Sequence, residues 1–196
     1  GEKTVSGTLG VKDGVLAFTF PDFAVTVEEE KKQAADPKAA EEVKSELNEI
    51  IGLSEVKDYV LSLEQNYIIQ RLREARGMKA DVPTMHMIFT GNPGTGKTTI
   101  ARLVSRYLKA MGVLSGGQLI EVTRADLVGK YVGHTAPLTQ QVIRSALGGV
   151  LFIDEAYSLY RGADDSFGLE AIDTIVKGME DHREDLIVIL AGYTKA

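Results

Sequence analysis

Residues 91–98 read Gly-Asn-Pro-Gly-Thr-Gly-Lys-Thr, which fits the pattern G-x-x-x-x-G-K-[S/T] in full. The pattern is typical of a loop whose glycines let successive backbone N–H groups surround phosphate oxygens. The apolar run Met85–Phe89 precedes it, and residues 98–111 carry apolar side chains at helical spacing. A strand, a glycine-rich loop and a helix in this order predict a phosphate-binding loop within an α/β domain.

Three more short apolar runs follow, separated by stretches with apolar residues at helical spacing. The runs are Leu119–Val122, Val150–Ile153 and Leu186–Ala191. Buried-type strands alternating with amphipathic helices predict βαβ units and a parallel sheet covered on both faces. We therefore expect a three-layer α/β/α fold of the P-loop NTPase class over residues 49–196, with its first long helix at about residues 54–75.

The pattern of the first 27 residues predicts a small β element. Thr4–Val11 and Val15–Phe20 flank an Asp-Gly pair, which is a strong signal for a β-hairpin. A third alternating run, Phe23–Val27, follows. So small a sheet buries little surface, and we expect an attachment or oligomerisation element rather than a catalytic one.

Residues 28–48 are charged and rich in alanine. Asp36-Pro37 resembles a helix start, because proline is favoured at the first helical position. We expect a linker here, followed by a solvated helix.

Composition removes several functional classes. With 22 Lys and Arg against 28 Asp and Glu, the net charge is −6, so we expect neither a nucleic-acid partner nor attraction to an anionic membrane. The chain has no cysteine, which excludes disulfides, thiolate metal sites and a cysteine nucleophile. No apolar run approaches the ~18 residues of a membrane span, and we expect a cytoplasmic protein.

The glycine-rich loop predicts ATP and Mg²⁺ as cofactors. Lys97 is expected to bring positive charge to the β- and γ-phosphates, and the Thr98 hydroxyl to ligate Mg²⁺. The alternative is a glycine-rich turn that caps a helix and leaves a lysine exposed. The residues predicted to bind the nucleotide here are Pro93, Gly94, Thr95, Gly96, Lys97, Thr98 and Thr99.

The apolar run at 150–153 ends in two carboxylates, Asp154 and Glu155. Because ligands of open parallel sheets gather outside the carboxyl ends of the strands, both acids are expected beside the phosphate loop. Asp154 is the candidate to hold Mg²⁺, and Glu155 the candidate to orient and polarise the attacking water. The alternative is a merely solvated strand end.

Several segments resemble AAA+ ATPases, and the match covers about residues 47–194. The segments are Gly91–Thr98, the Asp154-Glu155 pair and Asp126–Gly133. Gly133–Ala136, Gly148–Ser158 and Leu190–Tyr193 are similar to one branch, which includes the stage V sporulation protein K, the red-type RuBisCO activase and the type VII secretion ATPase. The motifs are shared by all three, and we favour the sporulation type.

The resemblance implies an ATP-driven remodeller of protein partners that assembles into a ring, in the full-length protein a hexamer. It assigns Tyr131, Val132 and Gly133 to a pore loop that grips an extended polypeptide, and Gly52 to the segment whose backbone meets adenine. An isolated surface tyrosine and a helix-to-helix turn are the respective alternatives. Lys97 and Glu155 would then both serve hydrolysis.

This chain also departs from the family pattern. AAA+ proteins commonly place an asparagine at the end of the fourth core strand to help position water, whereas Tyr193 or Thr194 stands here, and the Thr194 hydroxyl is a candidate for this catalytic role. The chain stops at Ala196, before the fifth strand, the arginine finger and the helical lid. We therefore expect a truncated fragment with weak or no hydrolysis.

Competing functions remain open. An Mg·ATP-dependent motor is the leading hypothesis, and a nucleotide-binding scaffold with little turnover is its rival, with a P-loop kinase third. Of the scattered residues, His86 is expected to be a hydrogen-bonded structural histidine. Arg124, Arg144 and Arg161 are expected to be solvated surface charges, and contacts between subunits are the alternative.

Overall fold

The computed structural model describes residues 8–12, 15–19, 35–49, 54–78 and 84–193. The chain divides into two compact units, residues 1–31 and 32–196. In the first unit, β1 (Thr8–Lys12) pairs antiparallel with β2 (Val15–Thr19), as the Asp-Gly signal predicts. The turn itself and the predicted run Phe23–Val27 lie outside the described residues.

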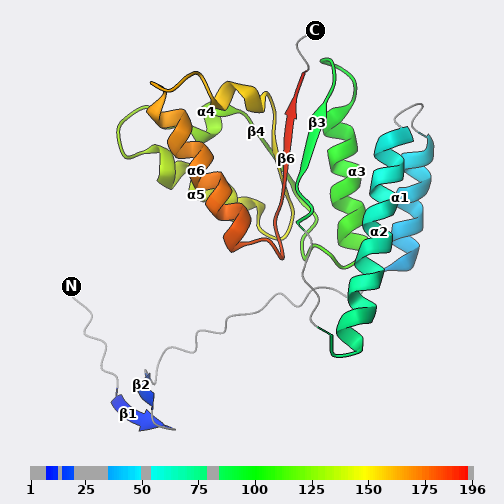
Figure 1. Cartoon of the computed structure of the whole chain (residues 1–196), viewed down its shortest axis with the longest axis horizontal. Helices are drawn as coiled ribbons and strands as arrows, with labels where there is room; N and C mark the ends of the chain where they lie inside the picture. Colours follow the sequence, from blue (N-terminus) through cyan, green and yellow to red (C-terminus); the bar gives the residue numbers. More distant parts are fainter. Residues whose placement is uncertain (1–7, 13–14, 20–34, 50–53, 79–83, 194–196) are drawn as a thin grey trace, which may run out of the picture. The chain divides into compact units, whose positions relative to one another are not determined.

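The second unit is built on a parallel sheet with the strand order β3-β6-β5-β4 (Figure 1). Its strands are β3 (Met87–Thr90), β4 (Leu119–Val122), β5 (Val150–Ile153) and β6 (Ile187–Gly192). The predicted runs at 119–122 and 150–153 match the strands in full, whereas the first strand begins two residues later than predicted. The predicted α/β fold with a parallel sheet is thus confirmed.

β5 shows why its sequence is apolar throughout. Val150 and Phe152 belong to one hydrophobic cluster, and Leu151 and Ile153 to a second one on the opposite face. All four side chains are fully buried. Successive strand residues point to opposite faces, so a strand covered on both sides needs an apolar residue at every position.

On one side of the sheet α3 (Lys97–Ala110) lies next to the strands, and α1 (Pro37–Glu49) and α2 (Ser54–Ala75) lie beyond α3 and share its hydrophobic cluster (Figure 1). Asp36 caps α1, because its Oδ1 accepts the backbone N–H groups of Lys38 and Ala39. The sequence predicted a solvated helix here; most residues of α1 are exposed, but Ala40, Val43 and Leu47 are buried on one side. Their spacing of three and four residues forms one apolar stripe, which the abundance of charged residues conceals.

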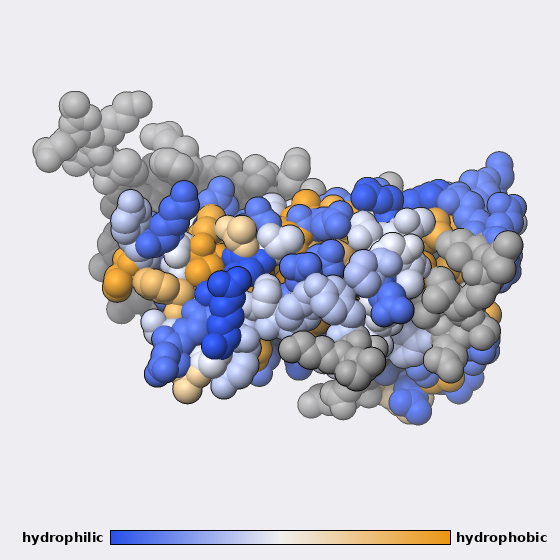
Figure 2. Space-filling model, turned by 90° about the horizontal axis from the view of Figure 1, so that it is seen from above, coloured by the Kyte–Doolittle hydropathy of each residue, from blue (hydrophilic) through white to orange (hydrophobic). Residues whose placement is uncertain are grey.

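The other face packs against α4 (Arg124–Leu127), α5 (Thr135–Ala146) and α6 (Ser166–Asp181), with the short 3₁₀ helix η1 (Ala156–Leu159) between β5 and α6. None of the described helices has both the length and the apolar character needed to cross a bilayer. Figure 2 looks onto the end where the strands of the sheet finish, and it shows mainly hydrophilic residues with separate apolar patches. His86, just before β3, accepts the Val188 N–H through Nδ1, as expected for a structural histidine.

Candidate functional site

The glycine-rich loop joins the end of β3 to the start of α3. Gly94 and Gly96 have φ angles of 77° and 82°, which lie in the left-handed region that residues with a side chain rarely adopt. A Cβ placed on either glycine would meet open space. The loop therefore needs glycine here for its backbone dihedrals, and the space beside these backbones is available to a ligand.

Lys97 is folded back over this loop. Its Nζ donates to the carbonyl oxygens of Gly91 and Asn92 at 2.8 and 2.9 Å, and the Thr95 hydroxyl donates to the same Asn92 carbonyl at 2.8 Å. These bonds tie the two ends of the loop together and hold the ammonium group of Lys97 against its first two carbonyl groups. Because an ammonium group has three donors, Lys97 retains one for an anion.

Thr98 lies in the first turn of α3, and its hydroxyl donates to Glu121 Oε1 at 3.2 Å. A hydroxyl that donates its proton in this way keeps its lone pairs for a cation. Glu121 was not among the residues that the sequence predicted for this site. The signal was present, because Glu121 is the one charged residue in the otherwise apolar β4, Leu-Ile-Glu-Val.

Asp154 and Glu155 follow the buried β5 directly. The Asp154 N–H donates to the Val122 carbonyl at 2.8 Å, and Asp154 Oδ1 accepts the Glu155 N–H at 2.9 Å. Glu155 has φ 48° and is, among the described residues, the only non-glycine residue with a positive φ. A conformation of this kind costs on the order of 1–3 kcal/mol and is often found at functional sites.

Two tyrosines approach the Glu155 carboxylate. The Tyr193 hydroxyl donates to Glu155 Oε1 at 3.2 Å, and the Tyr157 hydroxyl donates to that of Tyr193. The hydrogen bond to Tyr193 is the main cause that raises the pKa of Tyr157, followed by burial and by the charge of Glu155. The sequence offered Tyr193 or Thr194 for the end of this strand, and Thr194 lies outside the described residues.

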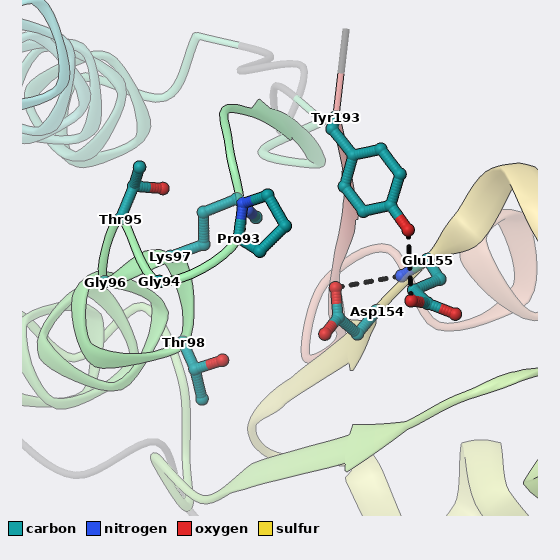
Figure 3. A pocket seen from close by; sticks show the side chains of 9 residues that line it. All are labelled: Pro93, Gly94, Thr95, Gly96, Lys97, Thr98, Asp154, Glu155 and Tyr193. Atoms are coloured by element: carbon teal, nitrogen blue, oxygen red, sulfur yellow. Dashed lines mark hydrogen bonds between the residues drawn. The ribbon is translucent and has the colours of Figure 1, made fainter. Parts of the chain in front are cut away.

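One cleft of about 390 Å³ brings these parts together (Figure 3). The phosphate loop forms one wall, and the ends of β5 and β6 form the other. Its lining residues are Pro93, Gly94, Thr95, Gly96, Lys97, Thr98, Asp154, Glu155 and Tyr193. Thr99 is exposed on α3 and does not line the cleft, and Gly52 lies outside the described residues.

The predicted pore loop lies apart from this cleft, between α4 and α5. Tyr131 is 68% exposed and Val132 88% exposed, and Gly133 has φ 80°. The base of the loop is closed, because the Gly129 N–H donates to the Thr135 hydroxyl at 3.0 Å. The rings of Tyr131 and His134 meet edge to face, with centroids 5.5 Å apart. The loop thus presents apolar side chains to solvent from a fixed base.

Arg124 is not the solvated surface charge that the sequence suggested. Its guanidinium makes a two-pronged ion pair with Asp165 at 2.7 and 2.8 Å and donates to the carbonyls of Ser158 and Leu159. The pair lowers the pKa of Asp165 to about 2, mainly through the hydrogen bond from Arg124. The prediction failed because it considered Arg124 alone, and the partner carboxylate is distant in sequence. This ion pair, the Arg124–Asp165 clamp, holds α4 against the segment that leads from η1 into α6.

Comparison with known proteins gives a consistent result. Residues 87–196 match the model of the ATPase family associated with various cellular activities, AAA. The chain is 47% identical over 165 residues to stage V sporulation protein K of Bacillus subtilis, covering 84% of this chain and 51% of that protein. It is 52% identical over 147 residues to a chloroplastic ribulose bisphosphate carboxylase/oxygenase activase of Cyanidioschyzon merolae, covering 74% and 48%.

A solved structure supports the fold. The FIGL-1 AAA domain, determined in complex with ADP, superposes with a TM-score of 0.50 at 23% identity and covers 72% of this chain and 46% of that one. The chain spans about half the length of the curated relatives named above.

Proposed function

This chain belongs to the AAA family of ATPases, and from that premise we propose that it binds Mg·ATP in the cleft between the phosphate loop and β5 and hydrolyses it by means of Glu155. The observation that carries the proposal is that Lys97 and Thr98 line the same cleft as Asp154 and Glu155. The phosphate loop and the acidic pair come from strands far apart in sequence, so their convergence is a property of the fold.

The loop fits a polyphosphate. Gly94 and Gly96 hold the backbone in conformations with open space beside it, and α3, with 14 residues, adds the partial positive charge of its N-terminus. Pro93, Thr95 and Thr98, which line the cleft, are proposed to complete the phosphate contacts. We propose the segment around Gly52 for the adenine.

The donor set also fits Mg²⁺. Thr98 offers a hydroxyl oxygen whose proton is directed to Glu121, and Asp154 offers a carboxylate on the facing wall. Oxygen donors of this kind are those that Mg²⁺ prefers. When bound, the ion neutralises charge on the phosphates, while Thr98 and Asp154 hold it in place.

Glu155 is proposed to accept the proton of the attacking water. Its carboxylate lies on the wall opposite the phosphate loop, where Tyr193 donates to one oxygen, Oε1. The second oxygen remains available to accept a proton from water, as a general base requires.

We further propose that the chain works on protein partners as part of a ring, which in the full-length protein is a hexamer. Tyr131, Val132 and Gly133 would grip an extended polypeptide, and their exposure supports this role. The similarity to stage V sporulation protein K suggests a partner in sporulation. The alternative, suggested by the similarity to RuBisCO activases, is a RuBisCO-type partner.

A Glu155→Gln variant tests the proposal, with hydrolysis measured in a single turnover with protein in excess over Mg·ATP. We expect ATP affinity to stay within about twofold while hydrolysis falls about 10²- to 10⁴-fold, since the loss of a general base has this magnitude. Glu180→Gln, an exposed glutamate on α6, is the matched control and should change neither quantity. Unchanged hydrolysis in Glu155→Gln would favour the scaffold alternative.

A further inference from the structure

We propose that Glu121 makes the cleft bind metal-bound nucleotide in preference to metal-free nucleotide, because it positions the Thr98 hydroxyl and places a negative charge beside it. This inference rests on the proposed function, since it assumes that Thr98 ligates Mg²⁺. Glu121 is not among the residues that line the cleft, so it acts through Thr98 and through its charge rather than by direct contact.

Glu121 stands at a position of β4 where the strand pattern favours an apolar residue. The strand reads Leu-Ile-Glu-Val, and Ile120 and Val122 pack in the hydrophobic cluster on the side of α5 and α6. Successive strand residues point to opposite faces, so Glu121 shares the α3 side of the sheet with Leu119. Its partner in the neighbouring strand, Phe152, is fully buried on that same side. A carboxylate that breaks the local pattern in this way is typical of a functional position.

The carboxylate of Glu121 has a defined partner in the first turn of α3. Its Oε1 accepts the Thr98 hydroxyl proton at 3.2 Å, across 23 positions of the sequence. Figure 3 shows Thr98 on the side of the cleft that the phosphate loop forms. A hydroxyl has one proton and two lone pairs, so a hydroxyl that donates to Glu121 keeps both lone pairs for a cation. Without this acceptor the hydroxyl rotates freely, and its proton can then point toward the place of the ion.

The negative charge of Glu121 is not neutralised by a neighbouring side chain. Among the described residues Glu121 takes part in no ion pair, and the Lys97 ammonium group is bonded to the carbonyls of Gly91 and Asn92 instead. A carboxylate at this place repels the phosphates of a metal-free nucleotide and attracts a divalent cation. Both effects raise the affinity for the metal-bound nucleotide relative to the metal-free one.

The first test measures binding rather than turnover. The ATP analogue AMP-PNP, which is not hydrolysed, is titrated against the chain at low salt, once with excess Mg²⁺ and once with EDTA. Glu121→Val removes both the acceptor and the charge, and valine suits a strand. We expect the affinity for Mg·AMP-PNP to fall about tenfold, because the partners of metal ligands contribute about this much, and the affinity for free AMP-PNP to rise about twofold.

Glu121→Gln separates the positioning of the hydroxyl from the effect of charge. The amide keeps an oxygen that accepts from Thr98 but carries no charge. The affinity for Mg·AMP-PNP should therefore fall only about two- to threefold, while the affinity for free AMP-PNP rises as in Glu121→Val. Glu180→Gln, an exposed glutamate on α6, is the matched control and should change neither affinity.

A double-mutant cycle tests whether Glu121 acts through Thr98. Thr98→Ala removes the hydroxyl that Glu121 positions. In that background Glu121→Val should lower the affinity for Mg·AMP-PNP by only about two- to threefold, the share of the charge, instead of about tenfold. Full additivity of the two substitutions would show that Glu121 does not position Thr98.

Two further results would overturn the inference. One is an unchanged ratio of the two affinities in Glu121→Val, and the other is an equal loss of both affinities, which indicates a general defect of the cleft. If Thr98→Ala abolishes the effect of Mg²⁺ while Glu121→Val leaves the ratio unchanged, only this inference fails. If Mg²⁺ does not tighten AMP-PNP binding to the wild type, the proposed Mg·ATP site itself fails.

Discussion

Two glycine-containing loops, residues 91–96 and residues 129–133, differ in the chemical groups that they expose. The first closes on itself through Lys97 and Thr95 and offers backbone N–H groups beside glycines. The second is closed at its base and projects Tyr131 and Val132 into solvent. Binding through backbone groups therefore requires a fixed loop shape. Binding through side chains depends instead on which residues the loop projects into solvent.

The glycines of the two loops are needed for different physical reasons. At Gly94 and Gly96 the constraint is a positive φ with open space beyond. At Gly129 it is space, because a Cβ would lie 2.7 Å from His134 Cβ and 2.8 Å from the His134 carbonyl carbon. The same residue type thus serves ligand access in one loop and close backbone packing in the other.

Lys97→Ala should have the largest effect and should be confined to the first loop. Loss of a charged hydrogen-bonding group is expected to weaken ATP binding by about 10- to 100-fold. Fluorescence titration with a labelled ATP analogue measures it, and Lys130→Ala in the second loop is the matched control. Equal losses in both variants would mean that the two loops do not divide their roles as described.

Gly129→Ala should cost more stability than Gly96→Ala. The added methyl at 129 meets backbone that cannot give way, which we expect to cost about 1–3 kcal/mol of unfolding free energy. At Gly96 only the dihedral is penalised, by about 1 kcal/mol. Urea unfolding measures both. The reverse order would show that the 129–133 loop can relax and is not held by its base.

Tyr131→Ala should change binding without changing the fold. Its side chain is 68% exposed, so the free energy of unfolding should stay within about 0.5 kcal/mol and ATP affinity should be unaffected. Cross-linking of the chain to a labelled, permanently unfolded protein should decrease, and Tyr59→Ala, 44% exposed on α2, should leave it unchanged. Undiminished cross-linking would remove the second loop from the proposed function.

The smallest effect concerns the Arg124–Asp165 clamp beside the second loop. The folded pKa of Asp165, about 2, is below its ordinary 3.8, so its contribution to stability is present above about pH 4 and is lost as the pH falls through about 2. Asp165→Asn should therefore be less stable than the wild type at about pH 6, and the difference should shrink toward about pH 2. Urea unfolding across this range checks the sign. A difference independent of pH would mean that the carboxylate charge contributes nothing.

Patterns local in sequence predicted most of the fold. β4, β5 and the long helix α2 lie at the predicted residues, because burial on two faces and helical spacing both leave signatures within one element. β3 began later than predicted, at Met87, since an apolar run does not show where ladder pairing starts. The buried stripe of α1 was not predicted, because the charged residues of this helix outnumber its three buried apolar residues.

Within the site, the phosphate loop and the acid pair were identifiable because each is a contiguous string. Glu121, Tyr157 and the partner of Arg124 were not, because each acts through a residue that lies far away in the chain. Tyr193 was one of two candidates until the geometry turned its hydroxyl toward Glu155. Pairwise contacts of this kind leave no periodicity and no fixed spacing.

By itself, the sequence determined the order of strands and helices, the loop that suits a phosphate and the two carboxylates that end a buried strand. These features depend on backbone dihedrals and on burial, which neighbouring residues set. Only the tertiary structure decided that the loop and the acids share one cleft, and which hydroxyl meets Glu155. The strand order β3-β6-β5-β4 decides those distances, because it places the end of β6 between the ends of β3 and β5.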